Sequence, residues 1–316
     1  MRFQDRTVIG TFTLPLAALW AVMVSVAAYL FAQGEWASMP ALAASTYCML
    51  EMNNHNMLLR KRSRMVSCSF LMLTMMCMGA NNHVGISIVQ LCFAGAIFLL
   101  TFTYQNKKMV GVLFYVALLV GISSFVWIHS IWLMLLLLLV IFRPLSSLSF
   151  RGINGMFFGL ALPYSIYATY RLWEKDLAWW EAKLQMLTDS RALFDYGNVQ
   201  IELIPPYVLM WVLTICSTFH FISYSYQDKV RVRMLYWMYI ALAWLTLILI
   251  ACAPCNAHYL LPIACIPVSV LTAHLFTHTS TKFSNISFSI AIILAMLITV
   301  FEVFHTFILT LLSTLA

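Results

Sequence analysis

Charged residues are scarce in this chain. Asp, Glu, Lys and Arg together make up 9% of its 316 residues, against about 25% in soluble domains. Hydrophobic residues make up 63% of the chain, and the mean hydropathy is +0.89. A chain with so few polar side chains cannot cover its surface in water, which excludes an ordinary soluble domain and makes lipid its solvent.

The chain also lacks the short motifs of common catalysts. Walker A, GxSxG, HExxH and the Rossmann glycine fingerprint have no match in the sequence, which excludes an obvious ATPase or serine hydrolase but not a membrane enzyme. No second CxxC accompanies Cys252 and Cys255 to complete four metal ligands. We therefore predict no metal site and no cofactor.

The charges that are present lie in short basic clusters between long apolar runs. The clusters are at 60–64, 107–108, 143–151 and 229–233. They fall between apolar segments, of which we count eleven, and most of these are near the length that crosses a bilayer. We predict an all-α, polytopic transmembrane bundle of about eleven helices that forms a single domain over residues 1–316. The segments are 7–32, 39–59, 65–80, 84–104, 109–124, 127–142, 152–171, 205–225, 234–253, 257–276 and 285–312.

The same clusters predict an orientation. With the N-terminus inside, 14 of the 18 Lys and Arg residues fall on the cytoplasmic side, as the positive-inside rule requires, and an odd helix count places the C-terminus outside. We predict a multi-pass protein of a bacterial inner membrane. The basic residues are spread over several loops and form no single patch, so we expect membrane lipids as partners and no nucleic acid.

Two segments need a special interpretation. Residues 109–142 would span about 51 Å as one helix, too long for a hydrocarbon core of about 30 Å, and we predict a hairpin of two short helices. The outer loop 172–204 carries Trp173, Leu177, Trp180, Leu184 and Leu187 at helical spacing. We predict an amphipathic helix lying on the outer leaflet, with a helix packed on other loops as the alternative.

Two acids fall inside apolar segments, where ionisable residues are functional candidates. Glu51 lies near Asn54 and indicates a polar pocket near the cytoplasmic headgroups; the alternative is a side chain that reaches the interface. Glu302 is followed one turn later by His305, which suggests a proton-relay pair. The alternative is a hydrogen bond between helices.

Three further sets of residues are candidates outside the spans. Glu35, the one acid in the first outer loop, would be the catalytic base of a transferase, or is merely solvated. Arg143 and Arg151 are candidate phosphate or lipid-headgroup contacts, or topology anchors. Cys252 and Cys255 are a candidate redox pair, or inert packing.

Three stretches together resemble a family of uncharacterised integral membrane proteins of Bacteroidetes. They are residues 51–59 (EMNNHNMLL), residues 142–145 (FRPL) with 150–152 (FRG) and 159–164 (GLALPY), and residues 261–263 (LPI) after a basic turn. The resemblance implies no activity. Its layout of many helices, a membrane-lying outer helix and incomplete central spans looks like the GT-C class of glycosyltransferases.

These observations favour handling of an envelope or lipid-linked glycan. The leading hypothesis is a sugar transferase that uses a polyprenyl-phosphate-linked sugar, with Glu35 as its base. The alternatives are an ion-coupled small-molecule transporter, with Glu51 or Glu302 and His305 at its site, and a non-catalytic membrane component of an envelope assembly. A transporter should place polar residues inside the bundle, whereas a transferase should place a cavity at the outer face.

Overall fold

The computed structural model describes residues 3–32, 35–61, 63–78, 83–147, 149–173, 185, 196–197, 201–279 and 281–315. Over these residues the chain is helical and contains no strand. Its helices are α1 (Phe3–Ile9), α2 (Thr13–Ala32), α3 (Ser38–Asn56), α4 (Met65–Met78), α5 (Val84–Leu100), α6 (Val110–Val126), α7 (Ser130–Phe142), α8 (Phe150–Trp173), α10 (Ile204–Tyr224), α11 (Val230–Cys252), α12 (Ala257–His278) and α13 (Lys282–Leu315).

The helices are those of a membrane protein. Six helical segments are long and apolar enough to cross a bilayer, and helices suit lipid because they satisfy their own backbone hydrogen bonds. The remaining helices are shorter or more polar, so eleven crossings stay a prediction. The six segments are Thr13–Leu30, Val84–Thr103, Ile201–Gln227, Val230–Cys252, Pro254–His278 and Lys282–Ile308.

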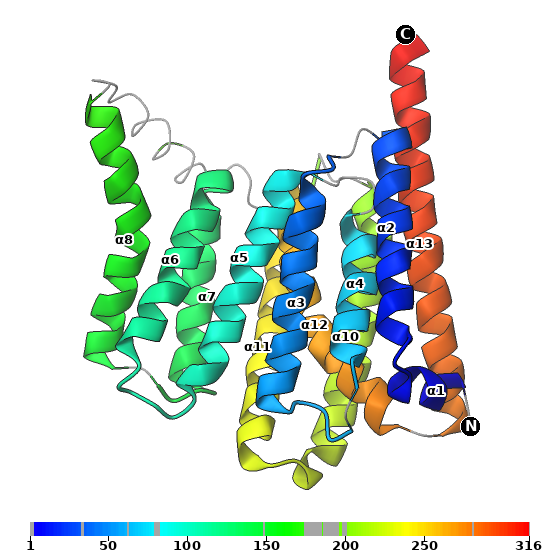
Figure 1. The fold of residues 1–316 in the computed structure, drawn as a ribbon, viewed down its shortest axis with the longest axis horizontal. Coiled ribbons are helices and arrows are strands. Elements are labelled where there is room, and N and C mark those ends of the chain that lie inside the picture. Colours follow the sequence, from blue (N-terminus) through cyan, green and yellow to red (C-terminus); the bar gives the residue numbers. More distant parts are fainter. Residues whose placement is uncertain are drawn as a thin grey trace.

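The connections between helices divide into two sets at opposite ends of the bundle (Figure 1). Helix α1 and the connections α3–α4, α5–α6, α7–α8, α10–α11 and α12–α13 lie at one end, which we call the basic end. The described Lys and Arg residues belong to these segments or to the helix turns beside them, with Arg171 at the end of α8 as the exception. The N-terminus lies at the basic end and the C-terminus at the opposite end (Figure 1).

Residues 109–142 form the helical hairpin that the sequence predicts. The chain turns at residues 127–129 between α6 and α7, and the two helices pack together. The ring of Trp127 stacks on Tyr259 with centroids 5.2 Å apart, and its Nε1 donates a hydrogen bond to Asn256 Oδ1 at 3.3 Å. The turn is therefore held against the α11–α12 connection.

The predicted amphipathic helix of loop 172–204 lies mostly outside the described residues. Trp173 ends α8 and is exposed, and the loop is described again from Ile201, where a short 3-10 turn, η3 (Ile201–Leu203), precedes α10. The position of that helix on the outer leaflet stays a prediction.

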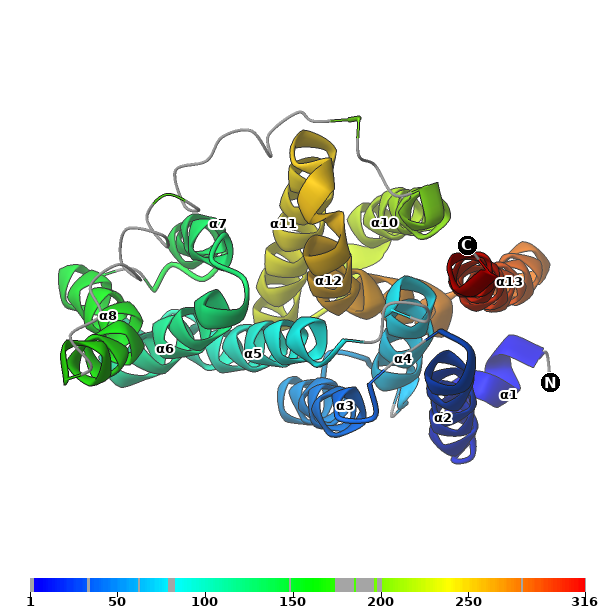
Figure 2. The same cartoon turned by 90° about the horizontal axis from the view of Figure 1, so that it is seen from above.

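Helix α12 is the centre of the bundle. Of its apolar window, 94% is buried, and it packs against α4, α5, α10 and α11, which surround it in the view along the bundle (Figure 2). The buried amide of Gln90 on α5 donates to Thr74 Oγ1 on α4 and to the carbonyl of Pro262 on α12, both at 3.0 Å. This amide joins three helices where no water is available.

Helix α8 lies at the edge of the bundle and packs mainly on α6. Glycines allow the close approach: a Cβ at Gly159 would overlap the carbonyl oxygen of Phe114, and one at Gly121 would lie 2.7 Å from Pro163. Small residues are how membrane helices approach closely enough for van der Waals packing.

We expect Gly159→Ala to lower stability by about 1–3 kcal/mol, because the new methyl group must separate α8 from α6. Gly111→Ala is the control, since a Cβ there would meet nothing within 4 Å. The measurement is thermal unfolding of the detergent-solubilised protein. Equal melting temperatures for the two variants would contradict the close α6–α8 packing.

Candidate functional site

Four ionisable side chains meet an arginine at the basic end of α10 and α12. We call Arg60, His220, Asp228, His274 and His278 the histidine cluster. His274 and His278 lie one turn apart on α12, His220 lies on α10, and Asp228 follows the short turn η4 (Ser225–Gln227) before α11. Arg60 comes from the α3–α4 connection.

Asp228 is the hub of the cluster. Its Oδ1 accepts a hydrogen bond from Arg60 Nε at 2.7 Å, and its Oδ2 lies 3.3 Å from His274 Nε2. The side chains of Asp228 and His274 are each 2% exposed, whereas Arg60 is 34% exposed. Burial alone would raise the pKa of Asp228, but the hydrogen bonds and charges of His274 and Arg60 outweigh it and lower the pKa to about 2.

Three imidazole rings pack beside this carboxylate. The rings of His274 and His278 stack with centroids 4.4 Å apart, and those of His274 and His220 are 5.6 Å apart. Three buried ring nitrogens have no hydrogen-bond partner among the described residues: Nδ1 of His220, Nδ1 of His274 and Nε2 of His278. Buried nitrogens of this kind are rare without a ligand or water to satisfy them.

A second group lies toward the opposite end of the bundle. We call Glu202, Glu302 and His305 the carboxylate cluster. His305 Nδ1 lies 2.8 Å from Glu202 Oε1. Glu302 is 2% exposed, and its Oε1 is buried without a partner in the described part of the chain. Glu302 lies close enough to Glu202 and Cys77 to interact with them electrostatically.

Sulfur atoms adjoin Glu302 in the interior. The Sγ of Cys77 on α4 lies 3.6 Å from the Sγ of Cys265 on α12 and 3.8 Å from the Sδ of Met210 on α10. The three residues are buried. This contact places the middle of α10 next to the side of α4 that Glu302 approaches.

Helix α10 connects the two clusters. Met210, Thr214, Ser217 and His220 follow one another at spacings of four, three and three residues, which places them along one side of a helix. Met210 to His220 covers about 15 Å at 1.5 Å per residue. The hydroxyls of Thr214 and Ser217 are buried without a partner among the described residues. We call these four residues the α10 column.

Several other buried hydroxyls in the bundle behave differently, whereas those of Ser67 and Ser87 also have no partner among the described residues. Thr246 Oγ1 donates to the carbonyl of Leu242 at 2.8 Å, Ser269 Oγ to that of Ile266 at 2.8 Å, and Thr277 Oγ1 to that of Ala273 at 2.7 Å. Donation to the preceding helical turn is the usual arrangement for Ser and Thr in an apolar environment. Thr214 and Ser217 depart from it, so α10 keeps two hydroxyls available inside the protein.

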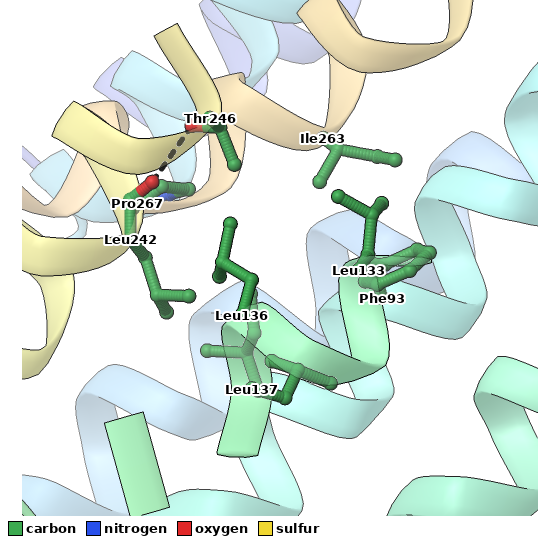
Figure 3. A pocket seen from close by; sticks show the side chains of 9 residues that line it. Phe93, Leu133, Leu136, Leu137, Leu242, Thr246, Ile263 and Pro267 are labelled. Atoms are coloured by element: carbon green, nitrogen blue, oxygen red, sulfur yellow. Dashed lines mark hydrogen bonds between the residues drawn. The ribbon is translucent and has the colours of Figure 1, made fainter. Parts of the chain in front are cut away.

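A small apolar cavity of about 10 Å³ lies between α5, α7, α11 and α12 (Figure 3). Its one hydroxyl, that of Thr246, is turned back to the Leu242 carbonyl. The cavity offers no polar group to orient a sugar or a phosphate, and it is too small to hold either. Its lining residues are Phe93, Ile97, Leu133, Leu136, Leu137, Leu242, Thr246, Ile263 and Pro267.

Glu35 lies between α2 and α3, at the end of the bundle away from the basic residues. Its Oε2 accepts a hydrogen bond from the backbone N–H of Val84 at 2.8 Å, at the start of α5, and its Oε1 lies 3.7 Å from His83 Nδ1. The carboxylate therefore caps a helix. Its role as a catalytic base stays a prediction.

The remaining predicted residues are not brought into either cluster. Glu51 is half-buried on α3 and Asn54 is exposed; the neighbouring Asn56 is the buried amide, bonded to Met52 O and Thr101 Oγ1. Arg143 and Arg151 are exposed on either side of the α7–α8 connection. Cys252 and Cys255 are half-buried near the α11–α12 connection.

Sequence reasoning joined His305 to Glu302, but the structure pairs His305 with Glu202. It also missed Asp228, His274 and His278. The spacing of His274 and His278, four residues apart on a helix, is a signal that could have found them, because it places two imidazoles on one face. Asp228 gave no such signal, since it opens a basic stretch that serves as a topology marker.

Comparisons with known proteins add a family but no activity. The model of DUF6427, described as a family of unknown function, matches residues 4–309. No curated protein and no solved structure matches the chain. The expected likeness to Bacteroidetes proteins and to the GT-C class therefore stays a prediction.

We expect Asp228→Asn to destabilise the protein by about 2 kcal/mol at pH 7. The change leaves buried histidines beside a neutral amide, and the loss is smaller than for a fully buried pair because Arg60 is partly exposed. Because folding lowers the pKa of Asp228, its contribution is complete above about pH 4 and is lost as the pH falls toward 2. Thermal unfolding at pH 7 and pH 3 measures it.

Glu51→Gln is the control for Asp228→Asn, because Glu51 forms no ion pair within the described residues. If the difference in melting temperature between Asp228→Asn and wild type were larger at pH 3 than at pH 7, the ion-pair account would be contradicted.

Proposed function

We propose that this chain, which belongs to the DUF6427 family of unknown function, is a proton-coupled membrane transporter. The observation that carries the proposal is the α10 column, which extends along about 15 Å of α10 from the contact of Met210 with Cys77, beside Glu302, to the histidine cluster. Ionisable and polar groups inside membrane proteins are costly and typically mark ion or proton pathways.

Glu302 supplies the proton-binding group of this pathway. Glu302 is 2% exposed, and one of its oxygens has no partner among the described residues. Burial disfavours the ionised form of a carboxyl group, so this side chain is suited to holding a proton inside the bundle. The Glu202–His305 pair lies beside it and is more exposed, with His305 at 40%. This pair exchanges protons with the solvent at the end of the bundle opposite the basic end.

The α10 column continues the proposed proton route from Glu302 toward the basic end. Leaving a buried hydroxyl unpaired costs about 1–3 kcal/mol, and Thr214 and Ser217 both bear that cost, although the Ser and Thr residues of α12 avoid it. Hydroxyls that can both donate and accept are suitable for passing a proton or holding a water molecule. The imidazoles of the histidine cluster then receive the proton near the basic end.

The transferase hypothesis gains no comparable support. It requires a free carboxylate at Glu35, which instead holds the start of α5. Arg143 and Arg151 lie at the basic end, the end opposite Glu35, so they could not hold a phosphate that reacts beside it. Handling of a polyprenyl-phosphate-linked sugar and a non-catalytic role in an envelope assembly remain predictions.

We expect Glu302→Gln to reduce proton flux at least about tenfold, because glutamine keeps the shape and cannot release a proton. The measurement uses proteoliposomes with a pH-sensitive dye inside and a potassium diffusion potential. Glu35→Gln is the contrast and should leave the flux at the wild-type level. Loss of flux in Glu35→Gln with retention in Glu302→Gln would contradict the proposal.

We expect Thr214→Val to reduce the same flux severalfold while preserving volume. Thr246→Val is the matched control, since its hydroxyl bonds only to its own helix, and it should transport like wild type. Both variants are first checked for monodisperse elution from a sizing column. Equal fluxes in the two variants would show that the α10 column is not the route.

A further inference from the structure

We propose that Asp228, His274 and His278 form a binding site for a divalent transition-metal ion. Each residue offers one ligand atom, and the three atoms lie within 4.8 Å of one another. Two imidazoles four residues apart on one helix, joined by a carboxylate from a neighbouring turn, are the ligand set and spacing that Zn²⁺ takes at sites with three protein ligands and one open position.

Hydrogen bonds prepare the ligand nitrogens. His278 Nδ1 lies 3.1 Å from the carbonyl oxygen of His274. A carbonyl oxygen can only accept a hydrogen bond, so this contact places the N–H at Nδ1 and the lone pair at Nε2. That Nε2 is buried without a partner in the described chain. A ligating histidine almost always donates its other ring N–H in this way.

His274 presents Nε2 to the site. This nitrogen lies 3.3 Å from Asp228 Oδ2, so a metal ion bound by both residues would replace the proton of their hydrogen bond. The ring N–H would then be at Nδ1, which is buried without a partner among the described residues. The side chain is 2% exposed, so water cannot reach that nitrogen freely. His220, whose ring lies 5.6 Å from that of His274, also has an unpartnered Nδ1 and is available as a fourth ligand.

Arg60 orients the site without filling it. Its guanidinium binds Asp228 Oδ1 and Gln227 Oε1 and leaves Asp228 Oδ2 on the side of the histidines. The guanidinium is one-third exposed, so solvent screens its repulsion of a bound cation. The donor set of nitrogen and carboxylate oxygen favours Zn²⁺ and similar first-row ions over Ca²⁺ or Mg²⁺, which prefer oxygen alone.

The metal site stands on its own geometry, whereas its assignment as the site of the transported solute rests on the proposed function. The cluster lies at the basic end of the same α10 column that we propose as the proton route, so a metal ion bound there would lie at one end of the route of the transported solute. This identifies the solute class as a divalent transition-metal ion.

The test is calorimetric titration of the chelator-treated, detergent-solubilised protein with Zn²⁺. We expect one ion per chain, and affinity at least about tenfold weaker in His278→Gln. The matched control is His258→Gln, which changes a histidine in the first turn of the same helix and should bind like wild type. Absence of stoichiometric binding, or equal affinity in His278→Gln and wild type, would overturn the site.

X-ray absorption of the Zn²⁺-loaded wild type provides a readout that needs no variant. Imidazole nitrogen and carboxylate oxygen in the first shell are the expected result, and sulfur ligands would overturn the site in favour of Cys77 and Cys265. Both measurements are made without a membrane gradient. Zn²⁺ binding without flux therefore refutes transport alone, and flux without Zn²⁺ binding refutes the metal site alone.

Discussion

Lipid offers no hydrogen bonds, and the rest of this structure depends on that constraint. Every polar group inside the bundle must find a partner in the protein or bear the cost of having none. Many groups find one: the amide nitrogen of Gln90 joins three helices, and the hydroxyls of Thr246, Ser269 and Thr277 bond to their own helices. Among the described residues, the buried polar atoms without a partner belong to Glu302, Thr214, Ser217 and the three histidines, and also to Trp20, Asn53, Ser67, Ser87 and the Oε1 of Gln90. The first six residues lie along α10 and at its two ends, where they define the proposed functional region.

The two clusters differ in ways that suit different tasks. The carboxylate cluster has two acids and a partly exposed histidine, which suit the proton exchange that we propose. The histidine cluster has one acid, three imidazoles and an arginine that neutralises the unused oxygen of Asp228. Helix α12, most of which is buried, supplies His274 and His278 from a fixed scaffold, and rigid placement of ligands is what a selective metal site requires. The α10 column joins the two clusters within one packed interface.

Much of the fold could be predicted from the sequence, because apolar runs of about 20 residues and the basic clusters between them report directly on lipid. The predicted hairpin at 109–142 formed because a single helix of that length would not fit a bilayer. The candidate sites were harder to predict from the sequence. Glu302 was found because an acid in an apolar run stands out. Glu202 and Asp228 were not found, since Glu202 lies in the turn η3 before α10 and Asp228 in the connection before α11. Pairs such as His305 with Glu202, 103 residues apart, follow from helix packing, which no local pattern records.

The most direct test of coupling between the two clusters is a Zn²⁺ gradient across wild-type proteoliposomes that start without a pH difference. A pH-sensitive dye in the lumen reports proton movement, and protein-free vesicles give the background. The account predicts that the Zn²⁺ gradient alone changes the lumenal pH well beyond that background, because metal and proton share the α10 column. A lumenal pH that stays at the protein-free level would contradict it.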